Sequence, residues 1–291
     1  MTLKAALKRL VISSPDPGRL ADFYARTFDY RVTLVGEECR CEAEARSLWI
    51  RRGPANQLLE AHFAFRHVPA LERYAAELRV REVPHRSAQL AGAAALVMSD
   101  PDGREVWFRA GRRIERRSAA PIPEVPAIAG ATLGVRPAAI PARLQHFALR
   151  SPAPQALADF YVEQLGFVTS DTVRDDSGEL TAAFLRSDPE HHSIAIFRAA
   201  ESRLDHFSCE TRNWRTLRDW ADRLAARAVQ LAWGIGRHGP GNDTFFMIAD
   251  PDGNLAEISS DLEVCAEDRP AGAWEHRPET LNRWGVALLR S

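Results

Sequence analysis

The sequence of 291 residues has little lysine, little cysteine and almost no net charge. Lys4 and Lys8 are its only lysines, and the formal net charge at pH 7 is −1. Nucleic acids and anionic membranes are bound through an excess of basic side chains, so neither is expected as a partner. No apolar run reaches the roughly 20 residues that cross a bilayer. Residues 1–4 also lack the apolar core of a secretion signal, so a membrane or secreted protein is not expected.

The four cysteines show neither zinc-site nor redox-motif spacing. Cys39 and Cys41 are separated by one residue, which is too close for a usual disulfide, and Cys209 and Cys265 stand alone. We therefore expect a reduced, intracellular protein and assign it to the cytoplasm. A hydrophobic content of 45% is ordinary for a globular protein, and the length allows one large or two ordinary domains.

The chain contains an internal repeat. The sequence LADFY occurs at residues 20–24 and again at 157–161, each time shortly after an apolar run that ends in Ser-Pro. The sequence DPDG occurs at residues 100–103 and again at 250–253. Two motifs repeated in the same order indicate duplication of one supersecondary unit.

Helices are predicted where apolar residues recur at helical spacing. In both copies the proline after the first strand is expected to stop strand pairing and to open a helix. Gly166 is expected to close the helix of the second copy. A further helix is predicted at about residues 214–226. The apolar positions of these two helices are Leu157, Phe160, Tyr161 and Leu165, and Leu217, Trp220, Ala221 and Leu224.

Two α+β modules follow from this pattern. The N-terminal module spans residues 1–118, a linker rich in Ala, Pro and Arg spans 119–140, and the C-terminal module spans 141–291. The tail after residue 261 contains Trp274 and Trp284, so we expect it to pack against a pocket mouth or another subunit.

Two histidines and one glutamate occur in apolar, strand-like runs of the second copy. His146 lies in the first strand, His206 in a middle strand and Glu257 in the last strand. Taken alone, an inward histidine is more often a hydrogen-bonded core residue than a ligand. A buried carboxylate needs a metal, an arginine or a proton, because an unpaired one costs several kcal/mol.

The first copy has different residues at the corresponding positions. They are Arg9, His62 or its neighbour, and Trp107, which cannot complete a metal site. The contrast favours a site in the second copy only. Two imidazoles and a carboxylate leave half of an octahedral metal site open, as in non-haem Fe(II) oxygen chemistry.

With these residues the sequence resembles the vicinal oxygen chelate superfamily and, within it, the type I extradiol ring-cleavage dioxygenases of the catechol 2,3-dioxygenase type. Two further matches are His192, which precedes an apolar strand, and the Gly-Arg-His-Gly loop that contains His238. The resemblance implies two tandem modules, each of paired βαβββ units that form a curved, half-open mixed sheet. It also implies a metal bound by His146, His206 and Glu257.

The implied cofactor is Fe²⁺, or Mn²⁺ in its place, and the implied partners are a small aromatic substrate and O₂. His192 is the candidate acid–base residue, because imidazole titrates nearest neutrality. The alternative for His192 is a surface position, since the residues before it resemble a turn, and His191 is assigned to solvent. His238 would orient substrate or oxygen. A homo-oligomer is compatible with the family.

Trp233, Phe245 and Met247 are expected to form an apolar wall for an aromatic ring, or to belong to the core. Many ring-cleaving relatives carry a tyrosine ten residues before the glutamate, where this chain has Met247. No arginine pattern indicates an acidic substrate, which favours a neutral catechol. The alternative functions are a lyase or isomerase of the same superfamily, and a protein that sequesters an aromatic ligand or antibiotic without turnover.

Overall fold

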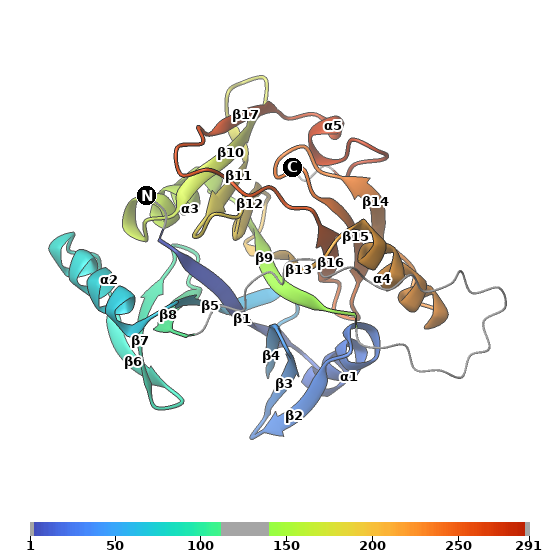
Figure 1. The fold of residues 1–291 in the computed structure, drawn as a ribbon, viewed down its shortest axis with the longest axis horizontal. Helices are drawn as coiled ribbons and strands as arrows, with labels where there is room; N and C mark the ends of the chain where they lie inside the picture. Colours follow the sequence, from blue (N-terminus) through green and yellow to red (C-terminus); the bar gives the residue numbers. More distant parts are fainter. Residues whose placement is uncertain (1–2, 112–139, 289–291) are drawn as a thin grey trace.

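The computed structural model describes residues 3–111 and 140–288, which form two mixed β-sheets with helices packed on them (Figure 1). The expected linker at 119–140 lies outside the described residues except for its last residue, as do residues 112–118 of the expected first module. Each half of the chain forms one sheet, as the repeat predicts.

The N-terminal sheet has eight strands in the order β2-β3-β4-β1-β5-β8-β7-β6. It consists of two βαβββ units joined where β1 runs antiparallel to β5. Its elements are β1 (Ala5–Ser14), α1 (Pro17–Phe28), β2 (Arg31–Val35), β3 (Glu38–Ala43), β4 (Arg46–Arg52), β5 (Gln57–Phe65), α2 (Val68–Val80), β6 (Arg86–Leu90), β7 (Ala93–Ser99) and β8 (Glu105–Ala110).

The C-terminal sheet has nine strands in the order β14-β15-β16-β13-β9-β12-β11-β10-β17. It repeats the same plan around β9 and β13, and the tail adds the edge strand β17. Its elements are β9 (Ala142–Ser151), α3 (Pro154–Asp159), η1 (Phe160–Gln164), β10 (Val168–Arg174), β11 (Leu180–Arg186), β12 (Ile194–Arg198), β13 (Arg203–Thr211), α4 (Trp214–Ala226), β14 (Trp233–Arg237), β15 (Thr244–Ala249), β16 (Leu255–Ser260), β17 (Gly272–Glu275) and α5 (Pro278–Leu281).

The first helix of each module begins at the second proline of a Ser-Pro-x-Pro run, Pro17 in α1 and Pro154 in α3. A proline suits this first helical position because its missing N–H would have no partner there. In the second module the α-helix lasts six residues and continues as the π-helix η1, where a single α-helix was expected. Gly166, at φ 82°, ends this helix as predicted.

The two repeated motifs lock the modules together reciprocally. Tyr24 of the first LADFY segment donates a hydrogen bond to Asp250 of the second DPDG segment at 2.6 Å. Tyr161 of the second LADFY segment donates to Asp100 of the first DPDG segment at 3.3 Å. Each tyrosine is buried, so each bond is shielded from water.

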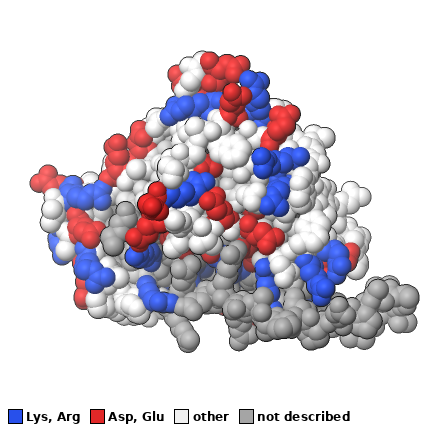
Figure 2. Space-filling model, turned by 45° about the horizontal axis from the view of Figure 1, so that its top comes forward, with Lys and Arg blue, Asp and Glu red and all other residues white. Residues whose placement is uncertain are grey.

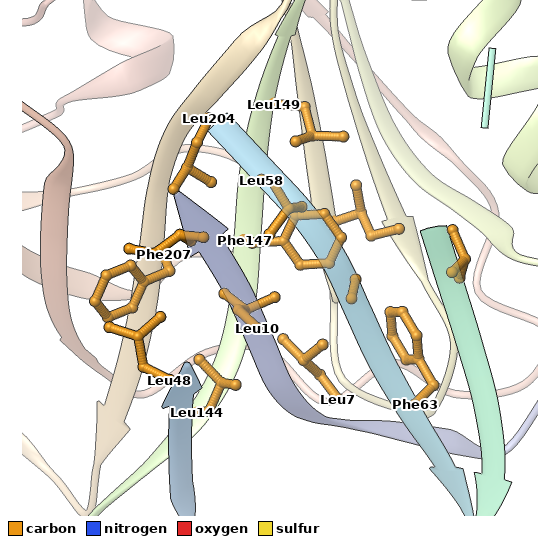
Figure 3. Packing of buried hydrophobic residues seen from close by; sticks show 14 of the residues in the cluster. Leu7, Leu10, Leu48, Leu58, Phe63, Leu144, Phe147, Leu149, Leu204 and Phe207 are labelled. Carbon is orange, nitrogen blue, oxygen red and sulfur yellow. The ribbon is translucent and has the colours of Figure 1, made fainter. Parts of the chain in front are cut away.

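One apolar core extends across both modules (Figure 3). The side chains of β1, β5, β9 and β13 interdigitate there, and the Phe63 and Phe147 rings lie 6.4 Å apart between centroids. Helix α4 adds Trp220, whose ring lies 5.8 Å from that of Phe28 in α1. The central strands of the C-terminal sheet are therefore backed by the N-terminal module.

Basic and acidic side chains are interspersed on the face drawn in Figure 2, without a large area of one sign. Within the described ranges, no helix has both the length and the apolar character needed to cross a membrane. The four cysteines are buried and unbridged.

Candidate metal centre in the C-terminal sheet

The three residues expected to bind a metal converge on one face of the C-terminal sheet. His146 comes from β9, His206 from β13 and Glu257 from β16, three neighbouring strands at the middle of the sheet. His146 Nε2 lies 3.2 Å from His206 Nε2 and 3.6 Å from Glu257 Oε1. All three side chains are buried, and their potential ligand atoms lie within 4.8 Å of one another.

A β-bulge directly precedes each of the two histidines. In the pairing of β9 with β13, Gln145 has no opposite residue between Leu144 and His146, and Asp205 has none between Leu204 and His206. Strict alternation would put Leu144 on the same face as His146. Instead Leu144 lies in the shared core and His146 lines a cavity on the other side, because the extra residue shifts the alternation.

The bulged residues also bond to the histidine rings. Gln145 Oε1 accepts a hydrogen bond from His146 Nδ1, and Asp205 Oδ1 accepts one from His206 Nδ1 at 2.7 Å. Both acceptors place the ring proton on Nδ1, so the lone pair of each Nε2 points to the common centre. The sequence signal for this role is a polar residue just before each histidine, Gln145 and Asp205.

Glu257 shows that the donor set suits a metal ion. Its carboxylate is wholly buried, and neither oxygen has a hydrogen-bond partner among the described residues. Burial acts to raise the pKa of Glu257, but His238, His146 and His206 lower it to about 2. Burial lowers the pKa of His146 to about 3, so its imidazole is neutral. Two imidazole nitrogens and an ionised carboxylate fit Fe²⁺ or Mn²⁺.

His192 lies inside the site, with its ring centroid 4.3 Å from that of His146. It is 3% exposed and lines the cavity, so the alternative of a surface position was wrong. The solvent position assigned to His191 was also wrong, because that side chain is 0% exposed. The tail covers this segment: the backbone N–H of His191 donates to Glu263 O at 2.9 Å. Burial and the neighbouring histidines hold the pKa of His192 well below its ordinary value.

His238 follows β14, whereas His192 precedes β12, and these two strands lie on opposite sides of the three strands that carry His146, His206 and Glu257. Its Nδ1 donates to the backbone oxygen of Leu281 at 2.6 Å, and its Nε2 lies 3.5 Å from Glu257 Oε2. Burial acts to lower the pKa of His238, but Glu257 and Asp243 raise it overall. Asp243, which was not predicted, is wholly buried without a hydrogen-bond partner for its carboxylate among the described residues, and burial raises its pKa to about 7.

The cavity above these histidines has an apolar wall. Trp233 and Met247 line it, whereas Phe245 is not a lining residue and instead stacks on the His238 ring at 3.7 Å between centroids. Neither arginine nor lysine is among the described lining residues, so the cavity offers no permanently charged cation to an acidic substrate. The remaining lining residues besides the histidines are Phe184, Ala195, Phe197, Pro240 and Leu281.

The C-terminal tail closes one side of this cavity. Leu281 of α5 belongs to its wall, and the indole of Trp274 packs on the same apolar cluster. Trp233 Nε1 donates to the tail oxygen of Val286 at 2.7 Å. Of the two expected positions for the tail, the structure shows the pocket mouth.

The N-terminal sheet carries different residues at the corresponding positions. By strand register the counterparts of His146, His206 and Glu257 are Arg9, Glu60 and Trp107. The suggestion of His62 for the middle position was wrong by two residues: Glu60 follows the bulge at residue 59 as His206 follows the bulge at residue 205, and His62 corresponds to Ser208.

These counterparts form ordinary structural contacts. The Arg9 guanidinium lies 3.5 Å from the Trp49 ring centroid, and His62 donates to Glu60 at 2.7 Å while stacking on Trp107. Among the described residues, no group that could hold a metal occurs in this sheet.

Comparisons with known proteins match both halves of the chain. Residues 143–258 match the model of the Glyoxalase/Bleomycin resistance protein/Dioxygenase superfamily, and residues 9–108 match the Glyoxalase-like domain. Metapyrocatechase 2 from Cupriavidus necator is 30% identical over 196 residues, which cover 64% of this chain and 59% of that protein. The match therefore spans less than two thirds of that relative's length.

Two solved structures share the fold over nearly the whole chain. The Mn(II)-bound glyoxalase from Novosphingobium aromaticivorans matches with a TM-score of 0.76 at 22% identity, covering 99% of this chain and 93% of that one. Homoprotocatechuate 2,3-dioxygenase from Brevibacterium fuscum, in complex with 3,4-dihydroxyphenylacetate, matches with a TM-score of 0.75 at 21% identity, covering 99% and 91%. These likenesses and the two family matches confirm the predicted fold class.

Proposed function

Since the chain belongs to the glyoxalase/bleomycin resistance protein/dioxygenase superfamily, we propose that it is a metal-dependent extradiol dioxygenase. The observation that carries the proposal is the buried, unpartnered carboxylate of Glu257 beside His146 Nε2 and His206 Nε2. The 30% identity to a metapyrocatechase supports the same reaction class.

His146, His206 and Glu257 would hold Fe²⁺, or Mn²⁺ in its place. When bound, such an ion supplies one meeting point for the two catechol oxygens and O₂ and lets electrons pass between them. Both oxygen atoms enter the product, and the ring opens next to the hydroxyl pair.

His192 transfers a proton, and His238 orients the bound oxygen or substrate. Neutral His192 takes a proton from a bound catechol hydroxyl and returns it later in the cycle, because its depressed pKa leaves it unprotonated at neutral pH. His238, fixed by the Leu281 backbone oxygen, presents Nε2 to bound oxygen or substrate. The apolar wall with Trp233 and Met247 excludes water from the ring.

The residues of this apolar cavity wall also indicate the class of substrate. A carboxylate on the substrate would be buried without an arginine or lysine to pair with, and an unpaired buried carboxylate costs several kcal/mol. We therefore propose a neutral catechol.

The test is ring opening by protein loaded anaerobically with Fe²⁺, mixed with catechol and then exposed to air. A yellow ring-opened product is expected. With 3,4-dihydroxyphenylacetate, kcat/KM should be at least about tenfold lower, which corresponds to about 1.4 kcal/mol. An equal or higher value for the acid would refute the neutral substrate. No product from a broad catechol panel with either Fe²⁺ or Mn²⁺ would refute the dioxygenase and favour the lyase, isomerase or sequestering alternatives.

A further inference from the structure

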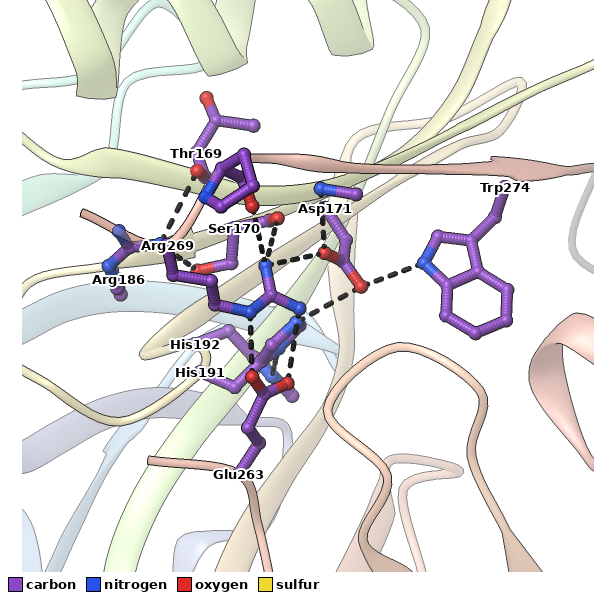
Figure 4. A network of polar contacts seen from close by, with 11 residues as sticks. Thr169, Ser170, Asp171, Arg186, His191, His192, Glu263, Arg269 and Trp274 are labelled. Atoms are coloured by element: carbon purple, nitrogen blue, oxygen red, sulfur yellow. Dashed lines mark hydrogen bonds and ion pairs between the residues drawn. The ribbon is translucent and has the colours of Figure 1, made fainter. Parts of the chain in front are cut away.

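A continuous chain of polar groups runs from the cavity to the C-terminal tail (Figure 4). His192 Nδ1 lies 3.0 Å from His191 Nδ1, and His191 Nε2 lies 3.1 Å from Asp171 Oδ2. The last contact has ion-pair distance but is not aligned as a hydrogen bond. His191 and Asp171 are both 0% exposed, and neither belongs to the group that could bind the metal.

Asp171, on β10, is fixed by three donors from the tail. Its Oδ1 accepts from Arg269 at 3.0 Å and from the Gly272 backbone at 3.1 Å. Its Oδ2 accepts from Trp274 Nε1 at 2.7 Å. Burial acts to raise the pKa of Asp171, but His191, Trp274 and Arg269 lower it to about 2. The carboxylate is therefore ionised and can only accept hydrogen bonds.

An acceptor at this position determines where the protons of the two histidines lie. The proton of a neutral His191 sits on Nε2, which faces Asp171, and its Nδ1 is then an acceptor. His192 must donate from its own Nδ1 to that acceptor. The Nε2 of His192, on the other side of the ring, is left with a lone pair. This arrangement needs no added positive charge, which suits a centre where four histidines are buried together.

We propose that Asp171 and His191 are positioning residues that hold His192 as the Nδ1–H tautomer, with basic Nε2 toward the substrate. In this arrangement the tail takes part in catalysis indirectly, because Arg269 and Trp274 orient Asp171. The consequence for turnover rests on the proposed function, whereas the tautomer itself does not.

Asp171→Asn tests the proposal most sharply. Because two donors face Oδ1 and one faces Oδ2, the amide oxygen of the substituted side chain stays at Oδ1. Its NH₂ group takes the place of Oδ2 opposite His191 and loses the bond from Trp274 Nε1. His191 must then accept at Nε2 and carry its proton on Nδ1, which forces His192 into the Nε2–H form. We expect kcat to fall on the order of 10²–10⁴-fold with little change in KM, as for loss of a general base. Asp175→Asn removes a nearby carboxylate that bonds Arg198 and should leave both parameters unchanged.

A pair of substitutions at His191 separates positioning from packing. His191→Phe keeps a ring but offers no acceptor to His192 Nδ1, so kcat should fall as in Asp171→Asn. His191→Asn can place its amide oxygen where Nδ1 lies and accept from His192, so it should recover at least about tenfold of the activity lost in His191→Phe. Equal activity of the two variants would contradict the proposal.

The tautomer is read directly by long-range ¹H–¹⁵N NMR of the full chain, labelled with ¹⁵N-histidine and measured without metal. His192 should be protonated at Nδ1 in the wild type and at Nε2 in Asp171→Asn. An Nε2–H form of His192 in the wild type, or no change in the variant, would overturn the proposal. The predicted tautomers without turnover of any catechol would instead refute the proposed function and leave the positioning role standing.

Discussion

Gln145 and Asp205 each combine two functions in one extra residue. As bulges they turn the following histidine to the cavity side of the sheet, and as acceptors they set the tautomer of its ring. Gln145 also donates to the backbone oxygen of His192 at 2.7 Å, so a single side chain ties a candidate ligand to the candidate base. Asp205 is held in turn by Arg150 at 2.7 Å.

Asp205→Ala should therefore weaken metal binding by about 10–100-fold, the usual effect of losing a group that orients a metal-bound histidine. The matched control is Glu60→Ala, which removes the carboxylate partner of His62 in the module without a site. Calorimetric titration with Fe²⁺ under nitrogen should give wild-type affinity for the control. Unchanged affinity of Asp205→Ala would show that the bulge residue does not orient His206.

The sequence located the candidate ligands because they fall at repeated strand positions where the first copy has unsuitable residues. It misplaced His191, because Asp-Pro-Glu before it resembles an exposed turn. Its burial depends on Asp171, twenty residues earlier, and on the tail, and neither contact leaves a periodic signal. The positions of the β-bulges could not be predicted from the sequence either, since the extra residue in a bulged strand has no distinctive residue type.

At the scale of elements, β17 attaches the tail to the sheet, where Leu281 and Trp274 of the tail join the apolar cluster beside the site. It pairs in parallel with β10 from Gly272 opposite Asp171 to Glu275 opposite Arg174. Arg269, just before it, bridges Asp171 and Glu263. The ionised carboxylate of Asp171 is thus one of the groups that fasten the tail to the sheet, beside the strand pairing itself.

The free energy of unfolding should depend on pH because the ionised Asp171 carboxylate helps to hold the tail on the sheet. The folded-state pKa of Asp171, about 2, is below its ordinary 3.8, so its contribution is complete above pH 4–5 and declines as pH falls towards 2. The full contribution is about 2 kcal/mol. The stability advantage of wild type over Asp171→Asn, from urea unfolding, should shrink by about 1 kcal/mol between pH 6 and pH 3. An advantage independent of pH would mean that the tail does not depend on this charge.

Among the helices, α4 was predictable from its apolar spacing, and its observed bounds, Trp214–Ala226, agree with that pattern. The π-helix η1 was not predictable, because Phe160 and Tyr161 fit an α-helical face equally well. The bond from Tyr161 to Asp100 does not account for it, because Tyr24 makes the equivalent bond to Asp250 from the regular α-helix α1.

At the scale of the whole molecule, the two duplicated modules have different roles: the C-terminal module carries the candidate metal site, and the N-terminal module packs against it. The N-terminal sheet keeps the strand order and the bulges of its partner but fills the ligand positions with Arg9, Glu60 and Trp107. It contributes the back of the shared core and the reciprocal tyrosine–aspartate bonds. The sequence revealed the duplication but not how the halves face each other, since that depends on side chains meeting across the boundary.

The two modules should consequently unfold in one transition. Tyr24→Phe removes a short, buried hydrogen bond to Asp250 and should lower the free energy of unfolding by about 1.5–3 kcal/mol while fluorescence and circular dichroism stay coincident. Tyr30→Phe is the control, because the buried hydroxyl of Tyr30 meets the Cys209 thiol, which is a weak hydrogen-bonding group, in place of a carboxylate. Separate transitions in the wild type would contradict a shared core.

The most direct test of the account is the metal stoichiometry, measured by anaerobic calorimetric titration of the full chain with Fe²⁺. Wild type should bind one ion per chain, and so should Glu105→Gln, which alters the corresponding last strand β8 of the N-terminal sheet. Glu257→Gln should bind at least about 100-fold more weakly, a loss of about 2.7 kcal/mol. Equal binding by Glu257→Gln, or no binding by the wild type, would contradict the metal centre and the oxygen chemistry built on it.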